Sequence, residues 1–115
     1  MPYIVLPGNH ENYQSGELFH YRFRMPGIGT EHQQFNNYYT FKYRSIFFLS
    51  VNFDLMMQIN HLLWTQTFQY IQRKLEMYAE DPSIKWRIFM SHKPFVCSDM
   101  TAKDCIMNHL MIKSF

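Results

Sequence analysis

The chain has 115 residues, a formal net charge of +2 and two cysteines. A chain of this length can form one domain that buries about two-thirds of its unfolded surface. The near-balanced charge, without a basic cluster, argues against a nucleic-acid groove, and no run is apolar and long enough to predict a membrane span. The first residues lack the basic and apolar regions of a signal peptide.

The first predicted element is a short strand at residues 3–6, an apolar run with one tyrosine. Pro7 and Gly8 follow it and predict a tight turn. Ligands bind at the carboxyl ends of strands in open α/β sheets, and a glycine lets the backbone bend sharply and approach a ligand closely. We therefore expect the residues after this turn to belong to a functional site.

Three side chains with metal or proton chemistry come next, namely Asn9, His10 and Glu11. An amide oxygen can bind a metal, and an imidazole can donate a proton or a hydrogen bond. A carboxylate can accept a hydrogen bond from an imidazole and fix its orientation. The pattern favours part of a two-metal hydrolase site. The alternative is a polar turn whose side chains cap the backbone.

The middle of the chain predicts a hairpin and a helix. After a long polar loop, strands are expected at 38–43 and 46–52, because both runs alternate and are rich in aromatic or β-branched residues. A loop at 53–60 precedes a helix at about 62–79, in which apolar residues recur at helical spacing. The predicted core-facing stripe consists of Phe68, Ile71, Leu75 and Tyr78.

A second strand with a polar end follows the helix. Asp81 and Pro82 are expected to end the helix, and residues 85–90 form an apolar, aromatic-rich run. His92 then stands at the carboxyl end of this strand, shortly before Pro94. Because this arrangement repeats that of the first strand and its polar turn, the sequence predicts a second ligand at the same site.

Five segments, in order, resemble the calcineurin-like metallophosphoesterase domain, and most closely the purple acid phosphatase family and its animal-type members. The resemblance is carried by a Gly-Asn-His-Glu block, an Arg-Phe-x-Met-Pro segment, an Asn-Tyr-Tyr strand start, a partner strand and a His-x-Pro block. These lie within residues 2–11, 21–26, 37–41, 46–50 and 86–98. The resemblance implies a four-layer α/β/β/α sandwich, of which residues 1–115 would form a central and incomplete part.

The resemblance also implies roles for individual residues. Asn9 and His92 would coordinate the same metal ion, and His10 would lie beside the substrate phosphate and assist the leaving group. The site would hold two metal ions, iron with zinc, manganese or a second iron, because such ions accept amide oxygen and imidazole ligands. Glu11 would support the site. His109 is a candidate for a further family histidine, although its spacing from the preceding cysteine differs from the family pattern.

Some blocks of the family do not occur in this sequence. Asp-bearing blocks that supply the bridging carboxylate would precede residue 1, and a closing Gly-His-x-His block would follow residue 115. Lys93 stands where the family has arginine, and Val96 where an aromatic residue is common. The resemblance thus implies a metal-dependent phosphatase for phosphate monoesters that requires the rest of its catalytic domain. The alternative is a truncated or catalytically incomplete homologue with a structural or assembly role.

Cys97 and Cys105 occupy places similar to those of two cysteines in animal-type members of the family. A disulfide between them would suit a secreted or lysosomal protein. The alternative is a pair of reduced thiols in a cytosolic protein.

Overall fold

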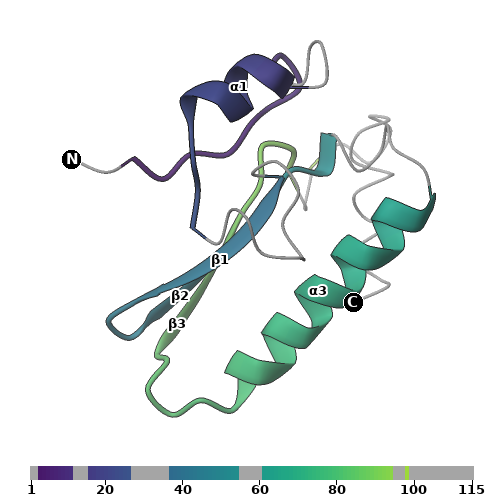
Figure 1. Ribbon diagram of the computed structural model, residues 1–115. Helices are drawn as coiled ribbons and strands as arrows, with labels where there is room; N and C mark the ends of the chain where they lie inside the picture. The colour runs from purple at the N-terminus through teal and green to yellow at the C-terminus, as the bar shows by residue number, and fades with distance from the viewer. Residues whose placement is uncertain (1–2, 12–15, 27–36, 55–60, 95–97, 99–115) are drawn as a thin grey trace.

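The computed structural model describes residues 3–11, 16–26, 37–54, 61–94 and 98. Within these ranges one sheet contains the strands β1 (Tyr38–Tyr43), β2 (Ile46–Val51) and β3 (Trp86–Met90), accompanied by the helices α1 (Glu17–Arg22) and α3 (His61–Ala79) (Figure 1). β1 and β2 pair antiparallel, whereas β2 and β3 pair in parallel. The fold is therefore mixed α/β, as the sequence predicts.

The predicted hairpin is present, and its tight turn consists of Arg44 and Ser45. The register places Tyr43 opposite Ile46 at the start of the ladder. Arg44 has a φ of 53°, the left-handed conformation that short hairpin turns use. Its guanidinium lies 5.6 Å from the centre of the Tyr43 ring, which is a cation–π distance. Successive side chains of the hairpin point to opposite faces of the sheet.

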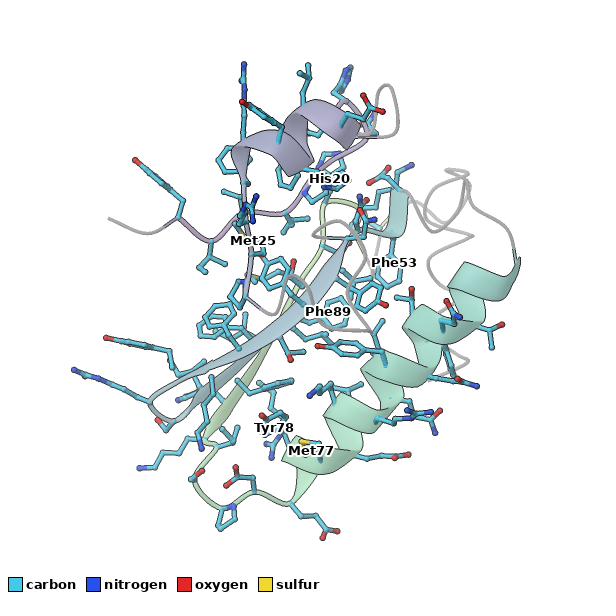
Figure 2. All side chains as sticks on the ribbon, viewed as in Figure 1. His20, Met25, Phe53, Met77, Tyr78 and Phe89 are labelled. Atoms are coloured by element: carbon cyan, nitrogen blue, oxygen red, sulfur yellow. The ribbon has the colours of Figure 1, made fainter. Side chains whose placement is uncertain are left out.

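The core lies between α3 and one face of the sheet (Figure 1). Phe47, Leu49 and Val51 of β2 alternate onto this face and are buried, and Ile71 of α3 is fully buried with them. Full burial of one such side chain stabilises a fold by about 2 kcal/mol. The helix begins one residue earlier than predicted. The buried cluster also includes Tyr38, Phe53 and Ile84, with Tyr70, Leu75 and Tyr78 partly buried against it (Phe53 and Tyr78 are labelled in Figure 2).

Side chains from the sheet fix the carboxyl end of α3. Arg87 of β3 donates hydrogen bonds from its guanidinium to the backbone oxygens of Tyr78 and Ala79, with 3.0 Å between Nε and the Tyr78 oxygen. Cationic groups are favourable at this end of a helix because its last carbonyls have no partner within the helix. Lys42 of β1 contacts Asp81 just beyond the helix. No helix within the described ranges is both long and apolar enough to cross a membrane.

The opposite face of the sheet is largely aromatic. Phe41 and Phe48 stack on it with ring centroids 4.6 Å apart, and Trp86 is 68% exposed. At one end of this face Tyr39 is fully buried, and its hydroxyl donates a hydrogen bond of 2.6 Å to the Val5 backbone oxygen. The N-terminal segment therefore lies against the face of the sheet that α3 does not cover.

The strand predicted at residues 3–6 is wrong for the described structure, because residues 3–8 join no ladder. Side chains take the place of a neighbouring strand at Val5. The backbone N–H of Val5 faces Met25 Sδ at 3.4 Å, and its oxygen accepts from the Tyr39 hydroxyl. The segment still leads into a turn at residues 9–11, as predicted.

The short helix α1 lies in a region predicted as polar loop. Gly16 precedes it with a φ of 73°, a conformation that glycine adopts without strain. Phe19 is its buried residue and contacts the Phe23 ring at 5.0 Å between centroids. One buried side chain in six residues carries no helical period, so the sequence pattern could not indicate this helix.

Candidate metal centre

Two polar turns that are distant in the sequence meet at one edge of the sheet. His92 follows the carboxyl end of β3, and Asn9 lies on the turn after the N-terminal segment. His92 Nε2 and Asn9 Oδ1 are 3.0 Å apart, although the residues are 83 positions apart in the chain. Both side chains are exposed. The structure thus brings together the two residues that the resemblance implies as ligands of one metal.

Gly8 is the reason that the His92 imidazole can lie so close to the N-terminal segment. A Cβ atom on Gly8 would lie 2.9 Å from His92 Nδ1 and 3.0 Å from its Cε1. Such distances are shorter than carbon and ring atoms tolerate, so only a glycine leaves room for the ring. Gly8 itself is buried. The ring therefore presents Nδ1 to the backbone and Nε2 to Asn9.

Glu11 closes the turn that carries Asn9 and His10. Its Oε2 accepts a hydrogen bond of 3.0 Å from the backbone N–H of Gly8. The carboxylate therefore caps the backbone, as the alternative reading of this turn predicts, and in the described structure it does not fix an imidazole. His10 is exposed on the same turn, and its ring has no hydrogen-bond partner within the described part of the chain. Its imidazole thus faces solvent beside Asn9.

The separation of the two donor atoms fits a common metal ion. Two ligands that each lie about 2.1 Å from one ion are about 3 Å apart at the right angles of octahedral coordination and about 3.4 Å apart at tetrahedral angles. The 3.0 Å between Asn9 Oδ1 and His92 Nε2 is a hydrogen-bond distance in this structure and also lies near the octahedral value. Among the residues that the structure describes, no three side chains of His, Cys, Asp or Glu gather at one point. This edge can therefore supply two donors of a larger ligand set.

An ion pair links the His92 turn to the segment after β2, and no pattern in the sequence indicates it. Lys93 Nζ is 3.4 Å from Asp54 Oδ1, and the Asp54 side chain is only 2% exposed. Asp54 falls in a region predicted as loop, and an aspartate in a polar loop is ordinarily solvated. The parallel pairing of β2 and β3 brings the ends of both strands to the same edge and so makes the contact possible.

Several of the residues that the sequence singles out, namely His109, Val96 and both cysteines, lie outside the described residues. Arg22 and Arg24, at and after the end of α1, are exposed. His20 packs edge-on against Phe19, and burial lowers the pKa of its imidazole.

Comparison with known proteins agrees with this geometry. The model of the calcineurin-like phosphoesterase family matches residues 1–114, and the chain therefore belongs to that family. Its members are phosphoester hydrolases that use metal ions. The acid phosphatases type 7 of Homo sapiens and of Mus musculus are each 24% identical to the chain over 117 aligned positions. The alignments cover 98% of the chain but 25% of each relative, so the chain spans about a quarter of their length. No solved structure gives a significant match.

Proposed function

We propose that the chain forms one edge of a dinuclear metal site that hydrolyses phosphate monoesters. Asn9 and His92 are the proposed ligands of one metal ion, and His10 is the proposed acid. The main support is the 3.0 Å separation of Asn9 Oδ1 and His92 Nε2, which suits two ligands of one ion. The family match and the similarity to acid phosphatases support the reaction class.

The chain's own residues have separate tasks in this proposal. Asn9 and His92 hold one ion, and Gly8 leaves space for the His92 ring. His10 hydrogen-bonds a phosphate oxygen and gives a proton to the leaving oxygen, because an imidazole can change its charge between pH 5 and 8. Bound metal ions supply Lewis-acid activation of the phosphate and of the attacking water.

The other ligands must come from outside the described residues. His109 is one candidate within the chain, and the rest of the catalytic domain would provide the others. Iron with zinc, manganese or a second iron is the proposed metal pair. The competing proposal, a catalytically incomplete homologue with a structural role, is favoured by the finding that only two donors meet at this edge in the described ranges. Asp blocks before residue 1 and a Gly-His-x-His block after residue 115 in a longer protein would favour the active phosphatase over the incomplete homologue.

Metal analysis combined with kinetics on the complete protein tests the residue roles. Asn9→Ala and His92→Ala should lower the metal content, because each removes a metal ligand. His10→Ala should keep the metals and lower kcat by about 100-fold, since a positioned acid is lost. Gln69→Ala, on the exposed side of α3, is the control and should change neither quantity. Full metal occupancy in Asn9→Ala or His92→Ala would contradict the ligand assignment.

We also propose a secreted or lysosomal location, with Cys97 and Cys105 joined by a disulfide. Closing so short a loop restrains the unfolded chain by about 2 to 3 kcal/mol. Peptide mapping without reduction, on protein from its native compartment, should recover the two cysteines in one linked fragment. Free thiols at both positions would contradict the bridge and favour the cytosol.

A further inference from the structure

The turn that carries His92 is tied to the end of the neighbouring strand by a buried ion pair. β2 and β3 run in parallel, and Ser50 pairs with Met90 at the end of their ladder. Asp54 and Lys93 follow these strands at the same edge, with 3.4 Å between Asp54 Oδ1 and Lys93 Nζ. Their side chains are 2% and 17% exposed, respectively, so water screens the pair weakly.

Stability alone does not account for this pair. Burying two charges costs desolvation energy that their attraction often only offsets, and a well-packed apolar pair is frequently as stable. The second Asp54 oxygen, Oδ2, is buried and makes no hydrogen bond within the described part of the chain. What the pair does provide is a fixed position for Lys93, because a buried carboxylate leaves its counter-charge few alternatives.

The fixed position of the Lys93 side chain restrains the backbone of His92, the preceding residue. His92 lies beyond the last paired residue of β3, in backbone without regular secondary structure. With the Lys93 side chain held inward at Asp54, the backbone of His92 is held as well. The exposed imidazole then lies against Gly8 and within 3.0 Å of Asn9.

We propose that Asp54 is a positioning residue of the metal centre, which acts through Lys93 to hold the His92 imidazole against Gly8 and Asn9. The purpose of this arrangement rests on the proposed function. The arrangement itself does not, because the orientation of the His92 ring can be measured without metal or substrate.

The test is an NMR comparison of the full chain with its variants, first without metal. The wild-type chain should show a nuclear Overhauser effect (NOE) between the Gly8 Hα protons and the His92 ring. Asp54→Asn should lose this effect and shift the His92 ring resonances, whereas Lys93→Arg should keep it because the ion pair persists. Asp81→Asn is the matched control, since it breaks the Lys42–Asp81 pair, which has a similar distance of 3.5 Å but is more exposed, and it should keep the effect.

A zinc titration gives the second measurement, on the same variants in the chain extended by the rest of its catalytic domain, because the two donors at this edge are only part of a ligand set. Asp54→Asn should weaken zinc binding by about 10-fold, the usual loss when a group supporting a metal ligand is removed. Asp81→Asn should bind zinc as the wild type does. If the wild type shows the NOE but binds no zinc, the proposed function fails while the positioning role of Asp54 stands on the ring measurements.

Two outcomes would overturn the positioning role: an Asp54→Asn chain with an unchanged NOE, or a wild-type chain without it. If Asp54→Asn does not fold, the double variant Asp54→Leu with Lys93→Met replaces it, because removing both charges leaves no unpaired buried ion. Loss of the NOE in that folded variant would support the proposal, and its retention would refute it.

Discussion

Gly8 is needed because it leaves space for the His92 ring, and not because its backbone has a positive φ. Among the described residues Gly16 is the glycine with a positive φ, whereas Gly8 has none. An alanine could therefore adopt the backbone of Gly8 without strain. The obstacle is the His92 ring, which lies where the added methyl group would be.

Gly8→Ala should displace the His92 imidazole from Asn9. The new Cβ would be 2.9 Å from His92 Nδ1, so the ring has to move. If the proposed site binds its metal, we expect the metal affinity to fall by about 10-fold or more, as for other changes that disturb the support of a ligand. Isothermal titration with zinc measures this loss.

A double-mutant cycle provides the control for this prediction. In a His92→Ala background the clash is absent, so adding Gly8→Ala should cause little further change in stability or in residual metal binding. Equal effects of Gly8→Ala with and without His92 would show that the contact is not the cause.

At the level of single residues, the sequence indicates the two turns that carry the site but not the groups that support them. His92 follows β3, as predicted, whereas Asn9 follows an apolar segment that forms no strand in the described structure. The contact of Glu11 with the Gly8 N–H matches the alternative interpretation of the turn, since a carboxylate near a turn can accept a hydrogen bond from either a backbone N–H or an imidazole. The Asp54–Lys93 pair depends on the register of two parallel strands, which a single sequence does not reveal.

At the level of elements, the successful predictions rest on periodic patterns. The hairpin alternates with period two, and α3 repeats its apolar residues at helical spacing, so both could be located within a residue or two. α1 has one buried residue, and the segment at 3–6 is an apolar run without a strand partner in the described structure. Short apolar runs do not distinguish a strand from other buried segments.

Arg87→Met should destabilise the junction between α3 and β3. The guanidinium donates to the backbone oxygens of Tyr78 and Ala79, which otherwise lack partners at the helix end. Methionine keeps the length of the side chain without donors, and we expect a loss of about 1 kcal/mol in the free energy of unfolding. Urea denaturation followed by circular dichroism measures it.

Arg73→Met is the matched control for this variant. Arg73 lies on the exposed side of α3, and its replacement by methionine removes the same positive charge as Arg87→Met. It should change the urea midpoint much less than Arg87→Met does, because exposed charges away from a specific contact contribute little. An equal shift in both variants would mean that net charge, and not the helix-end contact, sets the effect.

At the scale of the whole molecule, the described helices and loops cover one face of the sheet and leave most of the other uncovered. α3 covers the first face, whereas the second has an apolar surface, on which Trp86 is 68% exposed, made of Ile88 and the aromatic residues Phe41, Phe48 and Trp86. Surfaces of this kind normally meet another layer of protein. The four-layer sandwich that the family resemblance implies would place a second sheet on this face.

The 115-residue chain alone should be inactive as a phosphatase. Two donors meet at the described edge, and a dinuclear centre needs a more complete ligand set to hold both ions. The purified chain should show no metal-dependent turnover of a chromogenic phosphomonoester with added zinc, manganese or iron. Turnover at an ordinary enzyme rate would contradict this expectation, and an active acid phosphatase assayed in parallel serves as the positive control.

The distance along the chain between Asn9 and His92 has a consequence for synthesis. The hairpin closes through a turn of two residues and can form as soon as Val51 has left the ribosome. The Asn9–His92 contact spans 83 positions, so the entropy of closing this long loop opposes it until β2 and β3 have paired. On the ribosome, the candidate metal site therefore assembles only after residue 92 has emerged, with the sheet and α3 as its template.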